Sequence, residues 1–388
     1  GFRDAGMADG MVFRIGVAAR QQPLDHPRDD PVVLGVGAEH RWVASDSAAG
    51  TARGHCDTGG FPAVRAIQLD DRSDSRGRWR PFNTAGEGLM RILVTGGTGF
   101  IGKALVQRLQ LRGDAVIVLS RKPDSVHALF GENIEAWSSL SRWTPDTAID
   151  AVINLAGEPI IDRAWTASRK QVLRNSRIGI TDQLVRAMQA SSRKPSVLLS
   201  GSAIGIYGDS AAADITEHAS LGSDFGAQLC ADWEKSALQA EALGVRVCLL
   251  RTGLVLHADG GMLKKMRLPF KLGLGSRLGD GRQIMSWIHR NDYLDAVVFL
   301  LDHRHCHGAF NMTAPVPVDN RIFTETLARS LHRKAVLATP QFVLKTMLGE
   351  RSILLLGGQK ALPDKLLAQG IAFRFPHLAD ALQNTGVN

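Results

Sequence analysis

The sequence predicts an α/β fold, a doubly wound parallel sheet that carries a smaller C-terminal α+β lobe, and three observations support it. An apolar run at 91–95 leads into a glycine-rich turn and a helical pattern. Apolar strand-like runs then alternate with helical segments as far as Thr252, which is the order of consecutive βαβ units. Beyond Thr252 the alternation stops. The remaining chain is therefore expected to form a second lobe.

The first βαβ unit contains the turn Gly96-Gly97-Thr98-Gly99-Phe100-Ile101-Gly102. In such turns one glycine allows the sharp bend, a second lets a pyrophosphate approach the backbone, and a third lets the helix pack on its strand. The helix expected at 103–111 would point its N-terminus at the phosphates. With a second strand at 115–119, this spacing predicts a Rossmann dinucleotide site rather than a structural glycine turn.

The residues after the second strand indicate which dinucleotide is bound. NAD-binding proteins place an acidic residue about 20 positions after the glycines, where it binds the ribose hydroxyls. This chain has Ser120, Arg121 and Lys122 there. A guanidinium binds phosphate oxygens in bidentate fashion, so these residues favour the 2′-phosphate of NADP. A solvated basic turn is the alternative.

The later elements follow in order. A buried strand at 151–155 ends in Ala156 and Gly157, whose small side chains leave room for a ligand at the sheet edge. We expect a helix at about 168–190, a strand at 196–200, a helix at about 228–242 and a strand at 246–250. The Rossmann domain is expected at 90–257, with a last strand from about 309–314. Residues 258–388 are expected to form the substrate lobe, with loops, a basic segment at 264–271 and a helix at 292–301.

Residues 1–89 differ from the rest of the chain in composition. They contain many Arg and no Lys, are rich in Gly, Ala and Asp, and show no sustained helical or strand period. We expect either translated non-coding sequence upstream of a start at Met90, or a disordered arm. No apolar core follows a basic start, so a signal peptide is not expected.

Composition limits the class of partner. No run of 18 apolar residues occurs, so no membrane span is expected. The four Cys have no paired spacing, so neither a disulfide framework nor a zinc motif is indicated, and a reducing cytoplasm fits. The net charge of +8 is not gathered into long Lys/Arg tracts. A small anionic molecule therefore explains it better than nucleic acid does.

Taken together, the chain resembles an extended or atypical short-chain dehydrogenase/reductase of the NAD(P)-dependent epimerase superfamily, and within it the YfcH-like subgroup. The resemblance covers about residues 90–383. The matching residues are Thr95 to Gly102, Ser120-Arg121, Asn154 to Pro159, Ser176-Arg177, Arg251 to Gly253 and Ser286 to His289. The runs Gly357 to Pro363 and Phe373 to Pro376 match the subgroup's C-terminal cap of unknown function.

The resemblance implies a set of cofactor contacts. NADP should touch the glycine turn, Ser120, Arg121, Leu155, Ala156, Arg177 and the main chain near Val255. Arg177 lies on an expected helix, where a solvated face is the alternative.

The usual catalytic pair of this superfamily is missing. Members that transfer hydride use a Tyr as acid or base, with a Lys four residues later on the same helix face. The two tyrosines here, Tyr207 and Tyr293, are followed at that spacing by Ala211 and Val297. Where the pair is expected, the chain reads Phe225-Gly226-Ala227-Gln228-Leu229.

Ser202 and Tyr207 are the remaining catalytic candidates. Ser202 resembles the family's substrate-polarising Ser or Thr. Tyr207 would be a displaced acid, although a phenol near pKa 10 without a cationic neighbour suits that task poorly, and a core or pocket-wall role is the alternative. His289 is a candidate base, with a structural histidine as the alternative.

Two further groups of residues are candidate sites. An anionic substrate pocket is expected from Arg163, Trp165, Lys170 and Arg174, with Arg267, Lys271 and Arg282 on the opposite lobe, and exposed basic residues are the alternative. No metal site is expected, because the His and Cys at 303–307 follow a helix end and have no second ligand group.

The sequence thus favours an NADP-binding epimerase-like or oxidoreductase-like protein acting on a small anionic substrate. The alternative is a regulatory protein that senses NADP(H) without turnover, as the association of some relatives with cell division suggests.

Overall fold

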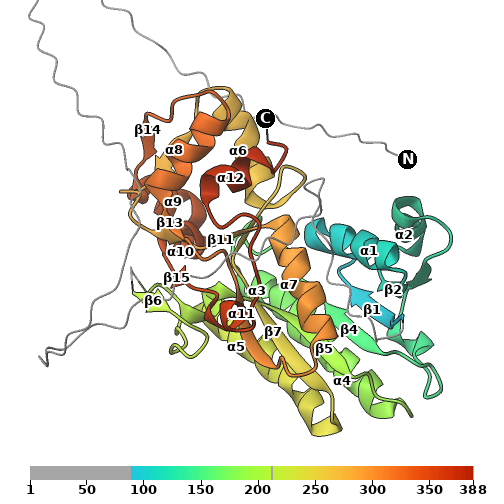
Figure 1. The fold of residues 1–388 in the computed structure, drawn as a ribbon. Coiled ribbons are helices and arrows are strands. Elements are labelled where there is room, and N and C mark those ends of the chain that lie inside the picture. The colour runs from blue at the N-terminus through green and yellow to red at the C-terminus, as the bar shows by residue number, and fades with distance from the viewer. Residues whose placement is uncertain (1–88, 211–212, 388) are drawn as a thin grey trace, which may run out of the picture. The chain divides into compact units, whose positions relative to one another are not determined.

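A seven-stranded parallel sheet organises the chain, of which the computed structural model describes residues 89–210 and 213–387 (Figure 1). Its strand order is β12-β7-β5-β4-β1-β2-β3. The strands are β1 Arg91–Thr95, β2 Ala115–Leu119, β3 Glu135–Trp137, β4 Ala151–Asn154, β5 Val197–Ala203, β7 Arg246–Thr252 and β12 Gly308–Met312. The predicted doubly wound α/β sheet is confirmed. The expectation for residues 1–89 lies, apart from Leu89, outside the described residues.

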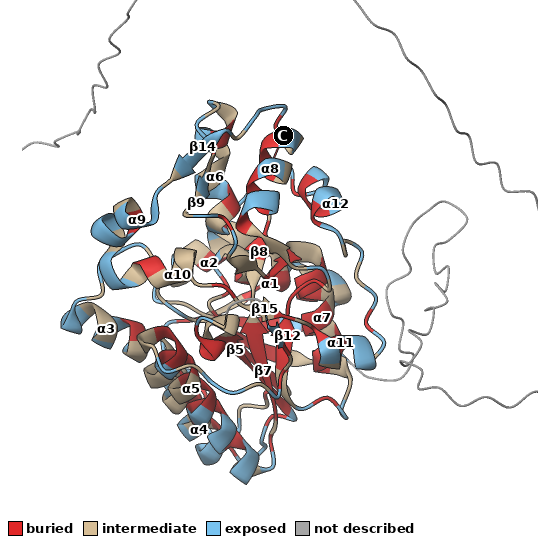
Figure 2. Ribbon diagram, turned by 90° about the vertical axis from the view of Figure 1, so that its left-hand side faces the viewer, coloured by how far each residue is buried: buried red, intermediate tan, exposed pale blue. Residues whose placement is uncertain are grey.

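Both faces of the sheet are buried, as the apolar runs require. Successive side chains of a strand point to opposite faces, so β1 contributes Ile92 and Val94 to one apolar cluster and Leu93 to another. Figure 2 shows the buried residues concentrated on the central strands and on the helix sides that face them.

The helices divide between the two faces. The first cluster takes apolar side chains from α1 (Phe100–Arg112) and α7 (Arg290–Asp302). The second takes them from α4 (Ile180–Ala190) and α5 (Phe225–Leu238). α7 therefore packs on the sheet although its residues fall in the expected lobe. A further helix, α2, spans Pro123–Phe130.

Helix boundaries differ from expectation for local reasons. The helix expected at 168–190 consists of α3 (Ala167–Arg174), a π-helical turn (Asn175–Gly179) and α4. α5 begins three residues before the expected start because Asp224 caps it, accepting hydrogen bonds from the backbone of Gly226 and Ala227. A 3₁₀ turn at Gln239–Leu243 follows it.

The rest of the chain forms the C-terminal lobe around a third apolar cluster that includes Trp287, Phe323 and Leu382. The basic segment at 264–271 is part of a helix, since Leu263 and Phe270 bury one side of it. The lobe's helices are α6 Gly261–Lys271, α8 Asn320–Ser330, α9 Gln341–Leu348, α10 Ile353–Leu356, α11 Asp364–Ala368 and α12 Leu378–Gln383. Its short strands are β8 Leu254–Leu256, β9 Ser276–Leu278, β10 Ile284–Met285, β11 Trp287–His289, β13 Val318–Asp319, β14 Leu337–Thr339 and β15 Lys360–Ala361, which pairs with β6 Asp214–Ile215.

Among the described residues, no helix has the length and apolar character needed to cross a membrane.

Candidate functional site

The glycine turn after β1 has a shape that only glycine permits. Gly96 has a φ of +69°, and a Cβ atom there would lie 2.6 Å from the carbonyl oxygen of Leu155. A Cβ atom on Gly102 would lie 2.1 Å from the carbonyl oxygen of Gly96. The end of β1, the start of α1 and the end of β4 are therefore in backbone contact.

The N-terminus of α1 is left available to a ligand. Its N-cap is Gly99, and no side chain of the described residues caps this end. The helix has 13 residues, of which Phe100 and Ile101 form the start. Backbone N–H groups at such an end bind anions, because they have no acceptor within the helix and the helix dipole favours negative charge there.

A buried chain of polar groups fixes the strand ends beside this turn. Thr95 Oγ1 donates to Asn154 Oδ1 at 2.6 Å, and Asn154 Nδ2 donates to Thr181 Oγ1 at 2.8 Å. The backbone N–H of Ala156 donates to Thr95 Oγ1 at 3.2 Å. Sequence reasoning missed this role of Asn154 and Thr181, although a polar residue ending an apolar strand is a usable signal.

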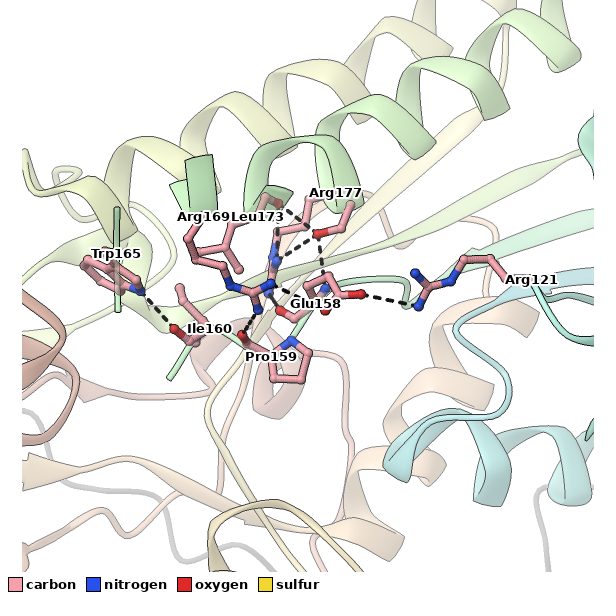
Figure 3. A network of polar contacts seen from close by, with 9 residues as sticks. Arg121, Glu158, Pro159, Ile160, Trp165, Arg169, Leu173 and Arg177 are labelled. Atoms are coloured by element: carbon pink, nitrogen blue, oxygen red, sulfur yellow. Dashed lines mark hydrogen bonds and ion pairs between the residues drawn. The ribbon is translucent and has the colours of Figure 1, made fainter. Parts of the chain in front are cut away.

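Arg177 fixes the segment that follows β4 (Figure 3). It lies on the π-helical turn and donates from Nη2 to the carbonyl oxygen of Glu158 at 2.9 Å. Its guanidinium carbon lies 5.5 Å from the centre of the Trp233 ring, and a Cβ atom on Gly157 would lie 3.1 Å from that carbon. Burial lowers the pKa of Arg177. The alternative of a solvated helix face is therefore wrong for this residue.

Arg121 lies at the end of β2 with 92% of its side chain exposed. Its Nη2 lies 3.3 Å from Oε1 of Glu158, a residue that sequence reasoning did not single out. Ser120 is turned toward its own loop, where its Oγ accepts from the backbone N–H of Lys122 at 3.1 Å. Val255, also expected to touch the cofactor, is buried in β8.

Ser202 at the end of β5 is 4% exposed, and its hydroxyl donates to Glu234 Oε1 at 2.7 Å. Arg251 on β7 holds the same carboxylate through Nε and Nη2, each at 2.9 Å. The hydroxyl proton of Ser202 is thus directed at Glu234, whose two oxygens already accept from a guanidinium.

Tyr207 belongs to the same buried group of polar side chains. Its hydroxyl donates to Asn311 Oδ1 at 2.6 Å and accepts from Arg251 Nη1 at 2.9 Å, and the residue is 4% exposed. The expectation that Tyr207 lacks a cationic neighbour is wrong, because the fold places Arg251 of β7, a strand distant in sequence, next to it. Burial nevertheless raises the pKa of Tyr207 despite the lowering effect of Arg251. We call Ser202, Glu234, Arg251, Tyr207 and Asn311 the buried network.

His289 is fully buried and caps α7, where its Nδ1 accepts from the backbone N–H of Asn291 at 3.2 Å. Its ring packs on Phe375 with 4.2 Å between ring centres. Burial lowers the pKa of His289 to about 4. These contacts are those of the structural histidine that the sequence offered as the alternative.

Several expected pocket cations have acidic partners. Lys170 Nζ lies 2.6 Å from Glu350 Oε2 on the lobe, and 5.0 Å from the ring of Phe225, which stands where the Tyr is expected. Arg174 pairs with Asp232 at 2.7 Å. Within the described part of the chain, no group of three or more His, Cys, Asp or Glu side chains could hold a metal ion.

Comparisons with known proteins agree with this architecture. Residues 92–312 match the model of the NAD dependent epimerase/dehydratase family, and residues 339–385 match DUF1731, a domain of unknown function. An epimerase family protein of Staphylococcus epidermidis is 36% identical over 301 residues, which cover 76% of this chain and 99% of that relative. One of Staphylococcus haemolyticus is 37% identical over 301 residues, with the same coverage.

Solved structures are similar over the same share of the chain. The human epimerase family protein SDR39U1 (isoform 2), crystallised with NADPH, is 35% identical with a TM-score of 0.70, covering 77% of this chain and all of that one. A nucleoside-diphosphate sugar epimerase from Corynebacterium glutamicum is 28% identical with a TM-score of 0.61, covering 77% of this chain and 58% of that one. From its sheet, its glycine turn and these matches, the chain belongs to the NAD-dependent epimerase/dehydratase family and carries the DUF1731 domain at its C-terminus.

Proposed function

We propose that this chain binds NADP(H) at the carboxyl ends of β1, β2 and β4. The observation that carries the proposal is the exposed guanidinium of Arg121 at the end of β2, beside a glycine turn that leads into a helix whose start no described side chain caps. The turn suits a pyrophosphate, and the guanidinium suits the 2′-phosphate that distinguishes NADP from NAD. The NADPH carried by the human relative supports the same assignment.

The proposal is tested by titrating the full chain with NADPH and NADH while cofactor fluorescence is recorded. Arg121→Ala should weaken NADPH binding at least about tenfold, because charge-assisted hydrogen bonds are lost, and should not weaken NADH binding. Arg193→Ala is the matched control, since Arg193 pairs with Asp150 at the opposite end of β4. Binding of neither cofactor would contradict the proposal.

The geometry favours a protein that senses the bound cofactor and does not carry out the proton transfer of its family. The hydroxyl of Ser202 donates to Glu234, and that of Tyr207 donates to Asn311. A group that already donates inside a buried network cannot donate to a substrate carbonyl without breaking that network. On this basis we propose that the protein is regulatory and cytoplasmic, and that a partner molecule responds to the binding of NADP(H).

The second candidate is an oxidoreductase or epimerase-like reaction on a small anionic substrate. It is favoured by the lobe, which meets the segment after β4 where Arg351 Nη1 donates to the carbonyl oxygen of Ile161 at 2.8 Å. In doubly wound folds, ligands bind beyond the carboxyl ends of the strands.

A cofactor-consumption assay over phosphorylated sugars and small carbonyls separates the two candidates. Turnover that disappears in Ser202→Ala or Tyr207→Phe would support the enzyme. Sensing predicts no consumption and an unchanged NADPH affinity in both variants.

A further inference from the structure

The ion pair between Arg121 and Glu158 joins the ends of two of the strands at which the cofactor is proposed to bind (Figure 3). The two residues follow β2 and β4, and β1 lies between these strands. Parallel strands end at the same edge of a sheet, and two strand spacings amount to roughly 10 Å. The two side chains therefore meet across the end of β1, where the glycine turn begins.

Glu158 is the fixed member of this pair. Its backbone N–H donates to Ser176 Oγ at 3.1 Å, and its carbonyl oxygen accepts from Arg177 at 2.9 Å. A second cation, Arg169, lies 3.6 Å from the other carboxylate oxygen and has only 10% of its side chain exposed. The carboxylate therefore keeps a positive neighbour when Arg121 leaves.

Arg121 is the member that can move. Its side chain is almost fully exposed, and exposed ion pairs are weak enough to exchange partners readily. An arriving 2′-phosphate offers this guanidinium a dianion in place of a carboxylate.

We propose that the Arg121–Glu158 pair is a strap that must open before a dinucleotide can bind at these strand ends, so that Glu158 lowers the affinity for every dinucleotide. The inference rests on the proposed NADP(H) site. Any dinucleotide must open the strap, which reduces the apparent affinity of NADPH and NADH by the same factor. Only NADP(H) then supplies Arg121 with a new partner, so the cofactor preference comes from Arg121 and the overall affinity is restrained by Glu158.

The test measures the dissociation constants of NADPH and NADH for the full chain and for Glu158→Gln, Arg121→Ala and the double variant. Glu158→Gln should bind both cofactors about two- to fivefold tighter, the range expected for an exposed pair. Arg121→Ala should bind NADH tighter by the same factor while losing NADPH. Because either change removes the whole strap, the double variant should bind NADH no tighter than each single variant.

Asp162→Asn is the matched control, since it removes one carboxylate from the same segment, where Asp162 pairs with Lys265. It should leave both affinities unchanged. Added salt should reduce the advantage of Glu158→Gln over the native chain, because screening weakens the strap. The exposed position of Arg121 makes Arg121→Ala a test that does not depend on how Glu158→Gln folds.

Unchanged or weaker NADH binding in Glu158→Gln and Arg121→Ala would overturn the strap. The NADP(H) site would still stand if Arg121→Ala lost NADPH alone. Failure of both cofactors to bind the native chain and all variants would overturn the site and the strap together.

Discussion

Two regions of the sheet's carboxyl edge differ in how far the fold itself satisfies the hydrogen-bonding capacity of their polar groups. At β1 and β2, no side chain of the part of the chain that the structure describes caps the start of α1, and the guanidinium of Arg121 is exposed. At β5 and β7, Ser202, Tyr207 and Arg251 are buried and bonded to one another or to neighbouring side chains. Groups that must bind a ligand are left with vacant hydrogen-bonding capacity, whereas groups satisfied within the fold stabilise it. The comparison predicts that the first region governs cofactor affinity and the second governs stability.

The largest expected effect comes from breaking the buried network. Arg251→Met leaves the carboxylate of Glu234 buried without its cation, which should lower the free energy of unfolding by about 3–5 kcal/mol. Urea unfolding measures this loss. The double variant with Glu234→Gln should recover part of it, because no charge is then left unpaired. If cofactor affinity of the folded Arg251→Met protein fell as steeply as its stability, the two regions would not be separate.

A smaller effect is expected at the glycine turn, where the substitution should act mainly on cofactor affinity. Gly102→Ala places a Cβ atom 2.1 Å from the carbonyl oxygen of Gly96, so the turn and the start of α1 must move apart. NADPH affinity should fall by about 100-fold, or about 2.7 kcal/mol. Fluorescence titration gives the affinity, and Gly205→Ala serves as a control because Gly205 has no positive φ and a Cβ atom there meets nothing within 4 Å. An unchanged affinity would show that the backbone of this turn does not hold the cofactor.

The smallest effect is a pH dependence. The pKa of His289 is lowered by burial to about 4, so neutral His289 contributes stability that is present above the unfolded value near 6.5 and is lost as pH falls. Going from pH 7.5 to 5.5 should cost about 1.4 kcal/mol. Asp292 opposes this, because burial raises its pKa to about 6 and its contribution is lost as pH rises.

His289→Asn isolates the histidine, since Asn keeps an acceptor at the N-cap of α7 but does not titrate. The native chain should lose more stability than the variant over this pH range, as followed by thermal unfolding. NADPH affinity should not separate the two proteins, because His289 is not among the residues proposed to bind the cofactor. If the stability of both proteins changed equally with pH, His289 would not be a group that links stability to pH.

The sequence predicted the parts of the molecule that depend on local patterns. β1, the glycine turn, α1 and β2 are contiguous, and their apolar periods and glycine spacing are visible without a structure. β3 was missed because Glu135-Ala136-Trp137 is too short and too polar to show a period. The partners of Ser202 and Tyr207 could not be predicted, since Arg251 lies 44 residues beyond Tyr207 and reaches it only through the pairing of β5 with β7. The contact of Glu158 with Arg121 could not be predicted for the same reason, because it depends on the order of the strands.

The last strand of the lobe has a consequence for biosynthesis. Gln359 Nε2 donates to the carbonyl oxygen of Gly208 at 2.7 Å, and β15 pairs with β6, so the segment after β5 takes partners about 150 residues later in the chain. Synthesis proceeds from the N-terminus at about 5–20 residues per second, so these partners emerge many seconds after the strands they complete. Gly208 and β6 therefore remain without these partners until the chain has been synthesised beyond β15.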